Sequence, residues 1–176
     1  MRYVAAFLML VVPAGLVSIA AGQNPSASSE TQPTIALTIK TEHSSVKIGD
    51  PIPIEVTLTN KSDHDLNLVR EIYGHDLLVN VRDADGKVPA DTKYGYLWNG
   101  HVANPDVNLV SPQDLRVGGY PVTVQTGETI PWVPINVAKL YQMSEPGKYR
   151  IQVQKKDPAD PQLNVKSNVI TVTVNP

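Results

Sequence analysis

The sequence of 176 residues contains no cysteine, and this absence excludes several kinds of chemistry at once. A chain without cysteine has no disulfide bonds, no cysteine nucleophile and no thiolate metal site. No cysteine follows the apolar N-terminal segment either, which excludes a bacterial lipoprotein anchor. The fold must therefore be held together by its hydrophobic core alone.

Phenylalanine is nearly absent, and neither sign of charge accumulates along the chain. The single phenylalanine is Phe7 in the N-terminal apolar segment, so tyrosine and tryptophan supply the aromatic volume of the remaining sequence. The formal net charge is −2, and the basic residues form no run. On these grounds we expect neither nucleic acid nor an anionic membrane as a partner.

Motifs for catalysis and for metal binding are missing as well. There is no G-x-S-x-G and no glycine loop that would cradle a phosphate. No two histidines have the close spacing of a local zinc pair; they are His43, His64, His75 and His101. The segment 83–86, Asp-Ala-Asp-Gly, is similar to the start of a calcium loop, but Tyr94 stands where that loop needs glutamate, so we expect a turn. We therefore predict no enzymatic activity, no cofactor and no metal.

The N-terminus has the pattern of an export signal. Arg2 precedes an apolar stretch that Pro13 and Gly15 interrupt, and small residues follow it, which predicts a cleaved signal peptide over 1–22. Residues 23–33 are polar and serine-rich, as expected of a flexible linker. We expect a secreted or periplasmic protein, free of the membrane after signal cleavage. In a eukaryotic source, Asn60-Lys61-Ser62 would be a glycosylation sequon.

Apolar residues alternate with polar ones over most of the chain from Thr34 onward, which is typical of half-buried strands. Strands are predicted at 34–41, 46–48, 52–60, 66–69, 77–83, 127–137, 147–155 and 168–175. Pro131 and Pro134 restrict the strand that contains them to a sheet edge or to bulged positions. One helical turn is expected within 137–143. The fold class is all-β, an antiparallel β-sandwich with an inserted hairpin or loop region.

The segment 140–151 resembles the corner between the fifth and sixth strands of immunoglobulin-like domains. Gly147, Tyr149 and Ile151 take the places of the corner glycine, the corner tyrosine and the following core residue. The resemblance implies that the Tyr149 hydroxyl bonds to the backbone upstream. Ile151 stands where antibody domains have cysteine, and we find no equivalent of their buried tryptophan on the third strand. The resemblance therefore concerns the immunoglobulin-like sandwich of residues 34–176.

Turn residues along the mature chain give a second, weaker likeness. The order of Thr59-Asn60, 76–86, Thr126-Gly127-Glu128 and 146–149 resembles BsuPI-type proteinase-inhibitor domains, and also the N-terminal region of deuterolysin-type proteases. This likeness implies an inhibitory or interaction role and assigns no residue to it.

The segment 87–125 exceeds what a sandwich of about 100 residues needs, so we interpret it as an insertion. Tyr94, Tyr96 and Trp98 would share one face of a strand, and Asn99-Gly100 favours a hairpin turn after them. These aromatics, with His101, are the candidate binding residues. The alternative is that the aromatic face completes the core.

The sequence thus predicts an exported, non-catalytic binding or interaction module whose partner is an unknown protein or carbohydrate. Three alternatives stay open: a secreted proteinase inhibitor, a purely structural domain or subunit of a cell-surface assembly, and an enzyme or metal-dependent protein, which would require the histidines and carboxylates to converge in space.

Overall fold

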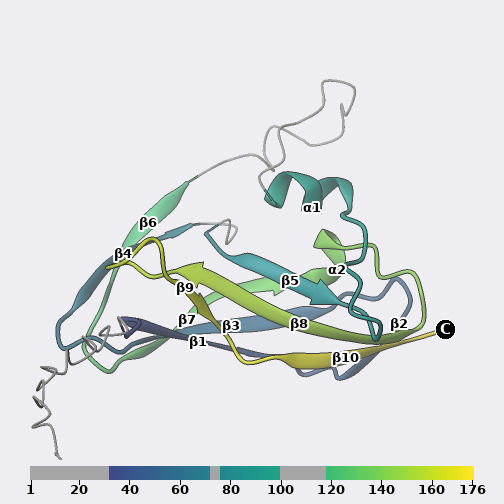
Figure 1. Cartoon of the computed structure of the whole chain (residues 1–176), viewed down its shortest axis with the longest axis horizontal. Coiled ribbons are helices and arrows are strands. Elements are labelled where there is room, and N and C mark those ends of the chain that lie inside the picture. Colours follow the sequence, from purple (N-terminus) through teal and green to yellow (C-terminus); the bar gives the residue numbers. More distant parts are fainter. Residues whose placement is uncertain (1–31, 72–75, 100–117) are drawn as a thin grey trace, which may run out of the picture. The chain divides into compact units, whose positions relative to one another are not determined.

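A computed structural model describes residues 32–71, 76–99 and 118–176. They form an all-β sandwich with two principal sheets, a separate two-stranded sheet and two short helices (Figure 1). The predicted fold class is confirmed. The predicted signal peptide and nearly all of the predicted linker lie outside the described residues.

The first principal sheet has three antiparallel strands in the order β1 (Ile35–Lys40), β3 (Pro53–Asn60) and β7 (Thr129–Asn136). As predicted, the strand with two prolines lies at an edge, where a missing N–H costs no sheet hydrogen bond. The pairing register shifts between Glu55 and Thr57, opposite the stretch of β7 that contains the prolines.

The second principal sheet has five strands. Its order is β2 (Ser45–Lys47), β10 (Ile170–Asn175), β8 (Gly147–Lys156) and β5 (Leu78–Arg82), and β9 (Asn164–Lys166) also pairs with β8. β2 runs parallel to β10, whereas β5, β9 and β10 run antiparallel to β8. The chain thus passes from one sheet to the other between β1 and β2 and returns at β3, which suits an immunoglobulin-like sandwich.

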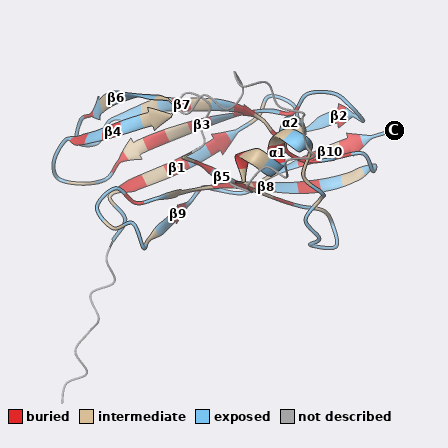
Figure 2. Cartoon of the chain, turned by 90° about the horizontal axis from the view of Figure 1, so that it is seen from above, coloured by how far each residue is buried: buried red, intermediate tan, exposed pale blue. Residues whose placement is uncertain are grey.

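The core lies between these two sheets. Alternate residues of each strand are buried, so buried and exposed segments succeed one another along β3, β8 and β10 (Figure 2). The inward positions predicted from the alternation are confirmed: Ile35, Leu37, Ile39, Ile52, Ile54, Val56, Leu58, Tyr149, Ile151 and Val153.

β4 (Leu66–Glu71) and β6 (Gly119–Val124) form the two-stranded sheet, and Asn60 anchors the bend that leads into it. The Asn60 side chain is fully buried, and its amide nitrogen donates to the carbonyls of His64 at 2.8 Å and Val124 at 2.9 Å. Its carbonyl oxygen accepts from the Ser62 amide at 2.8 Å. These three hydrogen bonds hold the bend between β3 and β4 in place.

The tyrosine corner is present as the immunoglobulin resemblance implies. Tyr149 is 4% exposed, and its hydroxyl donates to the carbonyl of Glu145 at 2.8 Å, four residues upstream. Burial raises the pKa of this hydroxyl, which keeps it protonated as a donor. The bond fixes the turn that precedes β8.

The predicted hairpin at 94–98 is wrong, because residues Lys93–Trp98 form a short helix, α1. The Thr92 hydroxyl accepts from the Gly95 amide at 2.9 Å, which is an N-cap. Gly95 permits a close approach to α2 (Val137–Leu140), since a Cβ there would lie 1.8 Å from the Leu140 carbonyl oxygen. The helical turn expected within 137–143 is confirmed by α2.

A buried polar cluster joins the two principal sheets near one end. Trp132 of β7 donates its indole N–H to Asp76 Oδ2 at 3.1 Å, and Lys155 of β8 forms an ion pair with the same oxygen. The Lys155 ammonium also lies 5.0 Å from the Trp132 ring centroid. These contacts satisfy the lysine charge between the sheets, where an uncompensated charge would be costly.

Candidate functional site

The predicted aromatic platform is divided by the helix. Tyr94 and Trp98 lie one helical turn apart with ring centroids separated by 6.0 Å, whereas Tyr96 points elsewhere and is 39% exposed. Trp98 is 8% exposed and belongs to the core, and Tyr94 packs against that core. The expectation that all three aromatics share one face is therefore wrong. His101, the fourth candidate, lies outside the described residues, as does His75.

Trp98 has a specific structural task at the edge strand β5. Its indole N–H donates to the carbonyl of Leu77 at 3.2 Å, and the Tyr141 hydroxyl donates to the carbonyl of Val79 at 2.5 Å. Carbonyls two residues apart point to the same side of a strand, so these two donors occupy neighbouring positions along one edge. The bonds hinder another strand from pairing with this part of β5.

Tyr94 and Trp98 also line a pocket of about 440 Å³ beside α1 and α2. Its other walls include Val133 and Ile135 of β7 and Leu140 of α2. The wall is mainly apolar, and one polar group in it, the Asn136 side-chain oxygen, already accepts from the Ile52 amide at 3.0 Å. The pocket therefore offers few groups that could orient a ligand.

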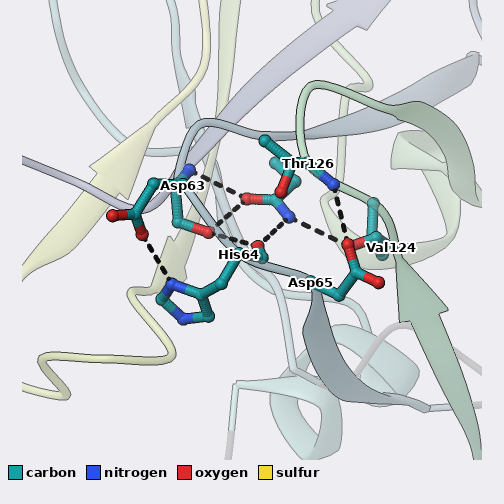
Figure 3. Close-up of polar contacts among 7 residues, drawn as sticks. Asp63, His64, Asp65, Val124 and Thr126 are labelled. Atoms are coloured by element: carbon teal, nitrogen blue, oxygen red, sulfur yellow. Dashed lines mark hydrogen bonds and ion pairs between the residues drawn. The ribbon is translucent and has the colours of Figure 1, made fainter.

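The described histidines and carboxylates do not converge. His64 pairs with Asp63 at 2.8 Å in an exposed turn, and Asp65 accepts from the Thr126 amide at 3.1 Å (Figure 3). Asp83 accepts from the amides of Asp85 and Lys87, as expected of a turn. Within the described ranges, no three side chains of the metal-ligating types gather into a group. No helix in these ranges is long and apolar enough to cross a membrane.

Charge is segregated on the five-stranded sheet in a way that sequence order conceals. Its five strands contain no aspartate or glutamate, but they contain several basic residues. Lys155 points inward to Asp76, and the others are exposed. We define the basic face as the outward side of this sheet with its exposed residues Lys47, Arg82, Lys148, Arg150, Lys156 and Lys166.

The pairing registers place these side chains close together. Arg150 lies opposite Arg82 on one side and opposite Thr171 on the other. Lys148 lies two residues before Arg150 on the same strand, about 7 Å away, and Lys166 lies opposite Gln154. Residues that pair directly share a face of the sheet, so the basic residues and the polar side chains between them form one surface.

These basic side chains have no carboxylate partners. The salt bridges within the described part of the chain involve Lys40, His64 and Lys155, and no residue of the basic face takes part in one. The three-stranded sheet differs, because Lys40 and Glu55 pair across it at 2.8 Å. No charge of the basic face is therefore neutralised by a salt bridge within the described residues.

No family model and no curated protein matches this chain. Similar solved structures include the CARDB domain of a Pyrococcus furiosus protein in complex with di-metal ions, 13% identical, with 81% of this chain and 89% of that chain covered and a TM-score of 0.38. Spo0M, a sporulation control protein from Bacillus subtilis, is 11% identical over 82% of this chain and 51% of that chain, with a TM-score of 0.43. A β-glucosidase from Erythrobacter marinus is 15% identical over 81% of this chain and 16% of that chain, with a TM-score of 0.40.

This chain thus spans about a sixth of the glucosidase and about half of Spo0M. All three TM-scores lie below 0.5, and we take no function from these likenesses. The resemblances to BsuPI-type inhibitors and to deuterolysin-type proteases stay predictions.

Proposed function

We propose that this protein is an exported, non-catalytic binding module that holds an anionic partner on its basic face. The supporting observation is the segregation of charge on the five-stranded sheet, where exposed lysines and arginines stand without carboxylates. Like charges that face each other across strands are destabilising. An anionic partner removes this repulsion when it binds, and it meets a surface that is already complementary in charge.

Two variants that reverse charge at different positions distinguish a binding site from general electrostatic attraction. Lys148→Glu/Arg150→Glu changes the basic face, while Lys61→Glu/Lys93→Glu makes the same change in net charge at exposed positions outside this sheet. We expect the first variant to lose about tenfold in affinity for polyanions, equivalent to about 1.4 kcal/mol. The second variant should bind like the unaltered protein.

Titration of the exported protein with soluble polyanions at low salt measures this difference. Circular dichroism and thermal unfolding establish that both variants are folded. Equal losses in the two variants, or a failure of every polyanion to bind, would contradict the proposal.

Export is part of the proposal and is supported by the N-terminal pattern of Arg2, an apolar stretch and small residues. We expect the mature chain to begin near Ala21 or Gln23. Mass spectrometry of the natively exported protein measures its N-terminus, and a full-length chain retained in the membrane fraction would refute the localisation.

The alternative functions each have a direct test. Titration against a panel of proteases tests the proteinase-inhibitor alternative. A purely structural role predicts that the basic-face variant behaves like the control variant towards every ligand. Nothing in the described ranges specifically favours either alternative.

A further inference from the structure

We infer that the anionic partner is a linear acidic polysaccharide whose sugars carry carboxylate or sulfate groups. This inference rests on the proposed function, because it specifies the partner of the same basic face. It is carried by the order in which charged and neutral polar side chains succeed one another across the sheet.

The basic face is organised in rows across the strands. One row contains Lys148 and Thr173, and the next contains Arg82, Arg150 and Thr171. A neutral row with Asn80 and Gln152 follows, and then a row in which Gln154 lies between the exposed Leu78 and Lys166. Successive rows are about 7 Å apart. Positive charges are thus interrupted by neutral hydrogen-bonding groups along the strand direction.

Several of the neutral side chains are available to a ligand. Gln154, Thr171 and Thr173 have no side-chain hydrogen bond to any other described residue, whereas the Gln152 amide donates to the Ser167 carbonyl at 2.9 Å. Amides and hydroxyls both donate and accept hydrogen bonds. They therefore match sugar hydroxyls, while the guanidinium groups match carboxylates or sulfates through paired N–H donors.

The basic face has few of the aromatic and apolar side chains that nucleic acids, protein partners and membranes require of a binding surface. The only aromatic residue in its strands is Tyr149, which is buried in the core, so the strands provide no platform on which nucleic acid bases could stack. Leu78 is the one exposed large apolar residue within these strands, and Ile48 and Val169 are exposed directly beside the ends of β2 and β10. A protein partner usually needs an apolar centre, and a membrane-surface segment inserts apolar side chains. A polysaccharide needs neither.

A panel of chemically defined probes tests the inference. The probes are polygalacturonate, dextran sulfate, uncharged dextran, poly-L-glutamate, oligothymidylate and vesicles with phosphatidylglycerol. Isothermal titration of the exported protein should give at least one acidic polysaccharide an affinity about tenfold above those of the non-carbohydrate probes, compared per charge. Uncharged dextran should not bind.

A second variant separates recognition of sugar from attraction to charge. Gln154→Ala/Thr171→Ala retains every basic residue, and we expect it to lower the affinity for the acidic polysaccharide severalfold without changing the affinity for poly-L-glutamate. Thr38→Ala/Thr57→Ala, on the three-stranded sheet, is the matched control and should bind normally.

The outcomes distinguish this inference from the proposed function. The partner is not a polysaccharide if poly-L-glutamate, oligothymidylate or vesicles bind as tightly as both acidic polysaccharides, or if the Gln154/Thr171 variant loses no affinity. In either case the proposed function, binding of an anionic partner, still holds. If no charged probe binds to the unaltered protein, both proposals are wrong.

Discussion

Arg82 and Arg150 lie directly opposite each other on the antiparallel strands β5 and β8, so two positive side chains share one cross-strand position. The Arg82 guanidinium donates to the Gly86 carbonyl at 2.7 Å, which ties it to the next turn. Neither arginine forms a salt bridge within the described residues. Local stability and the proposed binding function therefore oppose each other at this position.

Replacing one arginine of this pair should separate the two effects. We predict that Arg150→Glu raises the free energy of unfolding by about 0.2–1 kcal/mol, because repulsion across the strands becomes attraction. The same change should weaken polyanion binding. Chemical denaturation and titration measure the two effects, and Lys61→Glu controls for net charge. A destabilised Arg150→Glu variant would show that the pair is not repulsive in the folded chain.

Tyr149 gives a prediction about the corner before β8. Tyr149→Phe retains the buried ring but removes the donor to the Glu145 carbonyl, and we expect it to cost about 1 kcal/mol or somewhat more. Chemical denaturation with an unchanged m-value measures this loss. Tyr120→Phe, at an exposed ring, is the control and should be neutral. Wild-type stability of Tyr149→Phe would mean that the hydroxyl bond contributes nothing.

Much of the sandwich could be predicted because its strands have one buried face. Alternation identifies Ile54, Val56 and Leu58 as inward residues, and a one-residue slip would expose them all. The tyrosine corner was also predictable, since its glycine and tyrosine are two residues apart within one local motif. β9 was missed, because three residues give too short a pattern.

The helix α1 and the basic face show where sequence reasoning failed. Aromatics at 94, 96 and 98 fit a strand face, but the Thr92 cap on the Gly95 amide and the close packing of Gly95 against Leu140 favour a helix. The cap is local, whereas the packing depends on a residue far along the chain. The sequence alone shows that Lys148 and Arg150 are alternate residues of one strand and so share a face of it. Their neighbour Arg82 is brought beside them only by the strand register, which the sequence did not reveal.

The aromatic residues of α1 do not form a single platform, so the replacement of each one has its own expected effect. We expect Trp98→Ser to destabilise the domain by about 3–5 kcal/mol, because a buried ring and the donor to Leu77 are both lost. Tyr96→Ser should cost much less than Trp98→Ser, because the Tyr96 side chain is 39% exposed. Thermal and chemical unfolding of the two variants measure the contrast. Similar losses in both variants would contradict the placement of Trp98 in the core.

Asp157 makes the stability of the fold depend on acid pH. This carboxyl is 2% exposed and accepts from the Thr34 amide at 2.6 Å and the Thr34 hydroxyl at 2.8 Å, so it ties the start of β1 to the loop after β8. Burial alone would raise its pKa. The hydrogen bonds from Thr34 and from the Ala159 and Asp160 amides outweigh burial, and together they hold the pKa below its ordinary value of 3.8.

Because the pKa is lowered in the folded state, the direction in which stability changes with pH is defined. Above pH 3.8 the carboxylate is ionised in both states and its stabilising contribution is complete. As the pH falls below this value, the unfolded chain takes up a proton first, so the contribution declines until the folded state is protonated too. We therefore predict that Asp157→Asn is less stable at pH 7 by about 1–3 kcal/mol, and that its stability falls less steeply below pH 4. Urea denaturation between pH 2 and 7 measures both effects. Asp85→Asn, in an exposed turn, is the matched control, and an Asp157→Asn curve parallel to that of the unaltered protein would show that this carboxylate does not contribute to acid sensitivity.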